Sequence, residues 1–324
     1  MLQMRCSLYF FILHLISNFP AGVSHVNISH WACWEASFDA KAKAIAGATV
    51  FHLHISKVAG CSLVQDLTDM LGNRSKIYSD EVCFNASVDP RTGTSYFKDQ
   101  VTMVRHPRDH VLSMYQFCKQ GTEPGFTAHL ERRILMGMAP RRLPDTFSQW
   151  VDEWHESPHW GDYNIYEDEE MCYCPYNMQA SRLSCLEHKD EVPCYPTVDM
   201  DMALANLNAL TMLGVTEAYH ESICLFHGHL LGSLPEHCNC QSPAWDSYHE
   251  TKDTHGEKAY DGIESRPSEV LQKVDDMTQY DQVLYKAAVK RFFNDIQDME
   301  HRFGTKILCE KQRQTLNQKA FGTS

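Results

Sequence analysis

The sequence predicts an α/β fold, a single domain in which helices flank a central, mainly parallel sheet. From residue 48 onward, segments with strand patterns alternate with segments that have helical spacing of apolar residues. An apolar fraction of 43% and an aromatic fraction of 11% are typical of a globular protein. The 324 residues suffice for one large domain, and no linker divides them. We expect the domain to span residues 47–310, followed by a tail at 311–324.

Two strand–turn–helix units are the clearest elements of the pattern. Residues 48–55 are rich in branched and aromatic side chains and predict a strand, which a turn connects to a helix over 61–71. Residues 100–104 predict a second strand, which leads through Pro107 into a helix over 108–118. Proline is favourable there because the first helical residues need no N–H donor.

Later segments extend the alternation. We expect a helix around 147–154, a buried strand at 210–215, a helix at 219–230 and a long helix that includes 283–299. The acidic, cysteine-rich stretch 162–196 is expected to be irregular and held by disulfides.

The amino terminus resembles a targeting segment. Arg5 precedes an apolar run at 6–16, which is shorter than the roughly 20 residues of a membrane-spanning helix. We therefore expect residues 1–23 to be a signal peptide, with a retained signal anchor as the alternative, and residues 24–46 to be a stem. Glycosylation triplets at Asn27, Asn73 and Asn85 agree with entry into the secretory pathway.

The 13 cysteines indicate disulfides formed in an oxidising compartment. Zinc binding by the two Cys-x-Cys pairs is the alternative, but structural zinc sites favour Cys-x2-4-Cys and a matching second pair. We therefore expect no metal. A net charge of −13 excludes adhesion to nucleic acid or to an anionic membrane by bulk charge. Any anionic ligand must be held by a local site.

The first strand–turn–helix unit has the composition of an anion site. A helix amino terminus offers unpaired N–H groups and the positive end of the helix dipole. In this turn Lys57 adds a full charge, Gly60 permits close approach of the backbone, and Ser62 adds a hydroxyl. The lysine precedes the glycine, unlike the order in a Walker A loop, which argues against a kinase or NTPase.

The second unit predicts another anion site. Arg105 ends a strand and Ser113 follows on the next helix, so a guanidinium and a hydroxyl can meet on one phosphate. Two anion sites at adjacent strand ends suit a nucleotide that carries phosphates at both ends of its ribose.

Five segments, in a shared order, resemble motifs of the Golgi carbohydrate sulfotransferases. HISKVAGCSL at 54–63 resembles the 5′-phosphosulfate loop H-I-P-K-T-G-G-T-S-L, and RHPRDHVLSMY at 105–115 resembles the 3′-phosphate motif R-x-P-x-x-R-x-x-S-x-Y. Residues 213–223 and 281–285 are similar to V-G-x-T-E-x-F-D-E-S-L and D-x-x-L-Y, and residues 177–183 are loosely similar to N-x-Q-x-R-x-L, with the arginine displaced by one place. The chain therefore resembles the heparan sulfate 2-O and 6-O and galactosylceramide sulfotransferase-like members of this family.

The resemblance implies a P-loop NTPase-like sulfotransferase fold in the Golgi lumen, either type II membrane-anchored or secreted. It implies the donor PAPS (3′-phosphoadenosine-5′-phosphosulfate), released as PAP, a glycan acceptor and no metal. Lys57 and Glu81 would be catalytic. Residues 80–83 resemble an E-V-H segment whose glutamate is the base in the heparan sulfate 3-O branch, so Glu81 is the expected general base, with a solvated loop carboxylate as the alternative. The residues implied to bind the donor are Lys57, Val58, Ala59, Gly60, Cys61, Ser62, Arg105, Ser113 and Lys252.

Several positions depart from the family pattern. Ser56 replaces a proline, Val58 and Ala59 replace threonine and glycine, Cys61 replaces threonine, and His110 stands where a second arginine is common. These departures motivate a second hypothesis, a catalytically decayed, secreted binding protein of the same fold.

Overall fold

The computed structural model describes residues 48–88, 95–120, 144–156, 173–185, 197–252 and 262–322. All of them belong to one compact unit, Ala40–Ser324. The expected signal segment at 1–23 and the stem at 24–46 lie outside the described residues. Within the described ranges, no helix has both the length and the apolarity needed to cross a bilayer.

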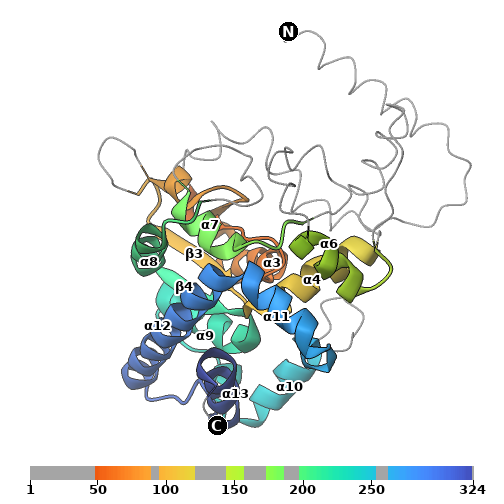
Figure 1. Ribbon diagram of the computed structural model, residues 1–324. Coiled ribbons are helices and arrows are strands. Elements are labelled where there is room, and N and C mark those ends of the chain that lie inside the picture. Colours follow the sequence, from red (N-terminus) through yellow and green to blue (C-terminus); the bar gives the residue numbers. More distant parts are fainter. Residues whose placement is uncertain are drawn as a thin grey trace, which may run out of the picture. The chain divides into compact units, whose positions relative to one another are not determined.

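The centre of the fold is a parallel sheet of four strands in the order β2-β1-β3-β4. Figure 1 labels β3 and β4 within it. The strands are β1 (Ala48–Leu53), β2 (Lys76–Asp80), β3 (Asp99–Val104) and β4 (Met212–Val215). Every residue of β3 and β4 is buried, as expected for parallel strands covered on both faces. The expected α/β architecture is confirmed, and its sheet is wholly parallel.

The connections leave the middle of the sheet in opposite directions. β1 leads through α3 (Gly60–Leu71) to β2 at one edge. β3 leads into α4 (Pro107–Gln120), and the chain later returns to β4 at the other edge. The strand order therefore reverses between β1 and β3. In open α/β sheets, ligands bind outside the carboxyl ends of the strands at such a switch point.

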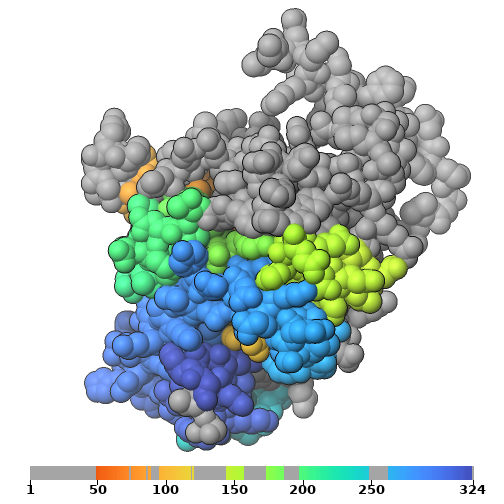
Figure 2. Space-filling model, in the orientation of Figure 1, coloured from red at the N-terminus to blue at the C-terminus, as the bar shows by residue number. Residues whose placement is uncertain are grey.

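Further helices pack around the sheet, with α9 and α12 against β4 and α3 against both β2 and α9. The coloured surface in Figure 2 runs mainly from yellow-green to dark blue, which are the colours of the helices from α6 onward. These helices are α6 (Phe147–Glu156), α7 (Met178–Ser184), α8 (Met200–Ala209), α9 (Tyr219–Leu231), α10 (Pro243–Lys252), α11 (Ser268–Met277), α12 (Gln279–Phe303) and α13 (Glu310–Phe321).

Two apolar clusters stabilise the described part of the chain. The larger surrounds the sheet and includes Phe51 and Phe292, both fully buried. The smaller joins α4, α6 and α11 through Trp150, which is also fully buried. The smaller cluster thus holds α4 in place, and with it the segment that follows β3.

Two expectations from the sequence need correction. The stretch 162–196 is not irregular throughout, because its described part contains α7, whose Leu183 is buried in the core. Residues from 311 onward do not form a tail in the described range. They form most of α13, whose Leu316 and Ala320 pack into the core.

Candidate functional site

The loop between β1 and α3 has an unusual backbone. Lys57 and Ala59 both adopt positive φ angles, 64° and 67°, a conformation that favours glycine. Gly60 begins α3, and a Cβ atom there would lie 2.1 Å from the His54 ring, so only glycine fits beside this histidine. Among the described residues no side chain caps α3, and its first turn carries no acidic residue. The helix end therefore suits an anion.

Two hydrogen bonds from other elements fix this loop. The Thr216 hydroxyl donates to the Val58 carbonyl at 3.1 Å, and His110 Nε2 donates to the Ser56 carbonyl at 2.7 Å. Burial lowers the pKa of His110 to about 3, so its ring is neutral at physiological pH. His110 therefore fixes the loop and contributes no second positive charge.

Arg105 directly contacts the Lys57 loop. Its Nη1 donates to the Lys57 carbonyl at 3.1 Å, across the boundary between β1 and β3. The Arg105 backbone is held by Gln179, whose Oε1 accepts from the Arg105 N–H at 2.8 Å and whose Nε2 donates to the Arg105 carbonyl at 2.9 Å. The structure thus brings the two predicted anion-binding segments together at the switch point of the sheet.

The segment after Arg105 is fixed by a buried carboxylate. The His106 N–H donates to Glu217 Oε1 at 2.8 Å, and the Tyr285 hydroxyl donates to Glu217 Oε2 at 3.0 Å. Burial raises the pKa of Glu217. In the next helix, Asp109 pairs with Lys319 of α13. The carboxy-terminal helix therefore supports the beginning of α4.

The other predicted donor-binding residues are placed as follows. Ser62 is half-buried and Cys61 is exposed, both in the first turn of α3. Ser113 lies on α4 and is 2% exposed. Lys252 is the last residue of α10, and its side chain lies outside the described part of the chain.

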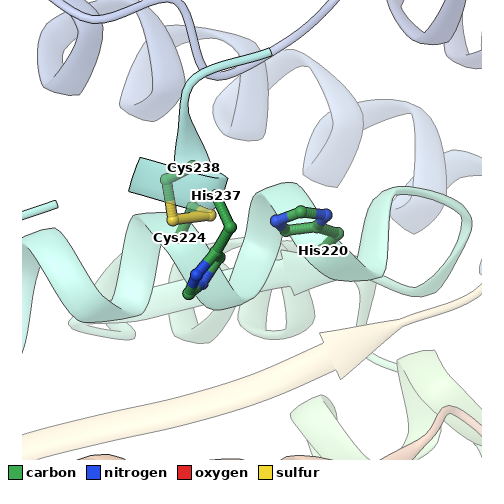
Figure 3. A group of neighbouring side chains, drawn as sticks. All are labelled: His220, Cys224, His237 and Cys238. Carbon is green, nitrogen blue, oxygen red and sulfur yellow. A yellow bond between two sulfur atoms is a disulfide. The ribbon is translucent and has the colours of Figure 1, made fainter. Parts of the chain in front are cut away.

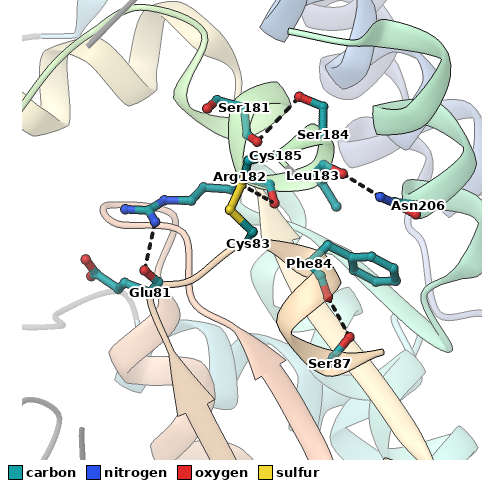
Figure 4. The surroundings of a disulfide bond; sticks show 10 residues. All are labelled: Glu81, Cys83, Phe84, Ser87, Ser181, Arg182, Leu183, Ser184, Cys185 and Asn206. Carbon is teal, nitrogen blue, oxygen red and sulfur yellow. Dashed lines mark hydrogen bonds between the residues drawn. A yellow bond between two sulfur atoms is a disulfide. The ribbon is translucent and has the colours of Figure 1, made fainter. Parts of the chain in front are cut away.

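Glu81, the predicted base, follows β2 at the same edge of the sheet. Its carboxylate lies 3.6 Å from His54 Nδ1, and its carbonyl accepts from Arg182 Nη1 at 2.7 Å (Figure 4). Burial is the largest effect on His54 and lowers its pKa, although Glu81 acts in the opposite direction. A disulfide between Cys83 and Cys185 ties the Glu81 loop to the end of α7.

Several cationic side chains lie at this edge although the chain as a whole is acidic. Lys57 and Arg182 both lie close enough to His54 to lower its pKa, and Arg105 contacts the Lys57 loop. The Lys57 ammonium lies 4.0 Å from the centre of the Phe117 ring, within range of a cation–π interaction. Lys57, Arg105 and Arg182 thus lie near the carboxyl ends of the strands, together with the acidic side chains of Asp80 and Glu81.

Sequence reasoning did not identify the supporting residues Gln179, Glu217 and His54. Gln179 and Glu217 fall inside segments that carry the family resemblance, and nothing else in the sequence marks them as part of a site. Their roles depend on contacts with residues 105 and 106, which are 74 and 111 positions away. His54 begins the segment that resembles the phosphosulfate loop, but nothing in the sequence indicates that it lies against both Gly60 and Glu81.

The predicted disulfides are present in the described residues, as Cys83–Cys185 and Cys224–Cys238. Disulfides of this kind persist in oxidising, secretory or extracellular compartments. Neither a protein-family model nor a curated protein matches the chain.

Proposed function

We propose that this protein is a PAPS-dependent sulfotransferase that transfers a sulfuryl group to a glycan hydroxyl. The observation that carries the proposal is the hydrogen bond from the Arg105 guanidinium to the Lys57 carbonyl. It joins the two segments that we propose to bind anions, at the switch point of the sheet, where a nucleotide with phosphates on both sides of its ribose would reach both. The P-loop NTPase-like sulfotransferase fold belongs to the same proposal.

The chain's own groups fit such a donor. The uncapped amino terminus of α3 and the Lys57 loop would hold the 5′-phosphosulfate. Arg105 would hold the 3′-phosphate, with Ser113 two turns further along the same segment. Lys252 is predicted to contact the nucleotide from a loop that covers it. Gln179 and Glu217 position the backbone of residues 105 and 106 for this task.

In the proposed reaction the donor PAPS supplies the sulfuryl group and leaves as PAP. Lys57 would neutralise the charge that develops on the leaving oxygen, as preorganised charges do in transition states. Glu81 would accept the proton of the glycan hydroxyl, and His54, 3.6 Å away, would orient its carboxylate. Donors positioned in this way can serve sulfuryl transfer without a metal.

The proposed location is the Golgi lumen. The two disulfides support an oxidising compartment, and the family resemblance supports the Golgi in particular. Anchoring by the amino-terminal segment and release after cleavage are both compatible with this location.

The test is transfer of labelled sulfate from PAPS to a panel of desulfated glycans by the full chain and by Lys57→Ala. Removing one preorganised charge costs about a hundredfold or more in rate, so we expect at least that loss. Lys290→Ala is the matched control because Lys290 is an exposed lysine on α12. Transfer by Lys57→Ala at the wild-type rate would refute the assigned role.

PAP binding distinguishes the alternatives. A ligand bound only by the folded state raises the melting temperature. Stabilisation by PAP without transfer to any glycan would favour a decayed binding protein that keeps the nucleotide site. Absence of any stabilisation would argue against a nucleotide site altogether, and displacement of PAP by ATP with magnesium would favour an NTPase.

A further inference from the structure

Four metal-ligating side chains meet away from the proposed donor edge. His220 and Cys224 come from α9, and His237 and Cys238 come from the short helical turn η6 (Glu236–Cys238) (Figure 3). One potential ligand atom from each residue lies within 4.8 Å of those of the other three. His220, Cys224 and Cys238 are buried, and His237 is half-buried. No part of the proposed sulfuryl transfer uses them.

The local sequence explains why the four residues meet. His220 and Cys224 are four positions apart on α9, so their side chains share one helix face. α9 ends before Gly232, which adopts the left-handed conformation. The chain then turns back, so that His237 and Cys238 lie beside the helix face that carries His220 and Cys224. The His220 ring is held in place by stacking on Trp245, with a centroid distance of 4.2 Å.

Cys224 and Cys238 form a disulfide in this structure, with their Cα atoms 5.5 Å apart. The two histidines flank it, and their ring centroids are 5.6 Å apart. A disulfide alone requires no imidazole beside it. Two imidazoles and two sulfurs at one point make up the donor set of a Cys2His2 zinc site.

We propose that the reduced chain binds one Zn²⁺ through His220, Cys224, His237 and Cys238. Zinc bonds of about 2.3 Å to sulfur and about 2.0–2.1 Å to nitrogen place the ligand atoms of a tetrahedral site roughly 3.3–3.8 Å apart. The present spread of up to 4.8 Å approaches this arrangement. The sulfurs must separate to about 3.8 Å, and η6 is the short element that would move.

The redox step balances with a thiol or phosphine reductant. A phosphine and one water convert the disulfide to two thiols, and the phosphine becomes its oxide. Zinc then replaces the two thiol protons, which are released, because thiolates are the ligands. The disulfide and the zinc site exclude each other because each uses both sulfurs. The cluster would therefore cross-link α9 to η6 in either redox state, with a different bond in each.

Cobalt(II) is the probe, because it takes zinc positions and its absorption reports both tetrahedral geometry and thiolate ligation. The full chain, reduced with a phosphine, is titrated with Co²⁺ under inert gas, and Zn²⁺ is then added to displace it. We expect one equivalent of tetrahedral, thiolate-ligated cobalt in the reduced chain and none in the oxidised chain.

Variants assign the ligands. His237→Ala removes a half-buried ligand with little effect on the core, and we expect its affinity to fall about a hundredfold, since loss of even outer-shell partners costs about 10–100-fold. Cys240→Ser is the matched control, because Cys240 lies two residues from Cys238 and outside the cluster, and it should bind as wild type. Near-ultraviolet circular dichroism of each variant, before and after reduction, compares the folding of the chains.

The proposal is overturned if the reduced chain binds no tetrahedral cobalt, or if His237→Ala binds it as tightly as wild type. Loss of binding in Cys240→Ser with retention in Cys238→Ser would also overturn it, since the ligands would then differ. The phosphine also opens Cys83–Cys185, so every comparison is between chains reduced alike. Metal binding is measured without PAPS, so the result is independent of the proposed sulfotransferase activity.

Discussion

Replacing Gln179 by alanine should disturb the proposed PAPS site, because Gln179 holds the backbone of Arg105. The Gln179 side chain is 1% exposed and makes two hydrogen bonds with the Arg105 backbone, at 2.8 and 2.9 Å. The substitution leaves an N–H and a carbonyl without these partners, and each buried polar group left unpaired costs about 1–3 kcal/mol. Because Arg105 is only partly buried, water can reach it. We therefore expect the free energy of unfolding to fall by about 2–3 kcal/mol.

Urea unfolding followed by fluorescence measures this loss, and calorimetric titration with PAP measures its effect on the site. We expect PAP affinity to fall about tenfold or more, because small displacements of a binding group are costly. The control is Gln272→Ala, which removes an exposed glutamine on α11 that bonds only Asp276 among the described residues. A Gln179→Ala chain with stability within about 0.5 kcal/mol of wild type would refute the reasoning.

Two further predictions concern buried and strained positions. Glu221 is buried, and neither carboxylate oxygen has a hydrogen-bond partner among the described residues. Burial raises its pKa from 4.5 to about 7. Between pH 4.5 and about 7, Glu221 is protonated in the folded chain but ionised in the unfolded chain. This difference contributes about 3 kcal/mol to the free energy of unfolding, which is fully present below pH 4.5 and is lost as the pH rises through 7. Glu221→Gln removes this ionisation, so its urea midpoint should fall less between pH 5 and 8 than that of the wild type. An equally steep fall in the variant would contradict the prediction. Ala59→Gly should stabilise the chain by about 1 kcal/mol, because the φ angle of residue 59 is 67° and favours glycine. Gly60→Ala should destabilise the chain by about 1–3 kcal/mol, because its Cβ atom would clash with the His54 ring. Thermal unfolding measures both changes, and two melting temperatures shifted in the same direction would contradict this geometry.

The elements that sequence could predict are those encoded locally. The β1–α3 and β3–α4 units were predicted to within about two residues at each end. Their apolar spacing is regular, and Pro107 marks a helix start. β2 was missed because it is an edge strand whose residues are mostly half-buried, which leaves no clear alternation. α13 was missed because its sequence is strongly polar and only Leu316 and Ala320 are buried.

The contacts that complete the sites could not be predicted in this way. Nothing near Gln179 in the sequence indicates that it will pair with the backbone of residue 105. The zinc alternative was set aside for lack of partner ligands, yet His220 and His237 lie beside Cys224 and Cys238 once α9 and η6 fold together. The spacing of His220 and Cys224 places them on one helix face, but their approach to His237 and Cys238 depends on how α9 and η6 pack, which residue spacing does not encode.

The pairing of Asp109 with Lys319 has a consequence for biosynthesis. Chains emerge from the ribosome amino terminus first, and domains fold as their residues become available. The β1 and β3 loops are made early, but the lysine that steadies the beginning of α4 belongs to the last described helix. A nascent chain therefore lacks this ion pair through most of translation, and premature stop mutations ahead of α13 should weaken PAP binding by the loops that we propose to hold the nucleotide.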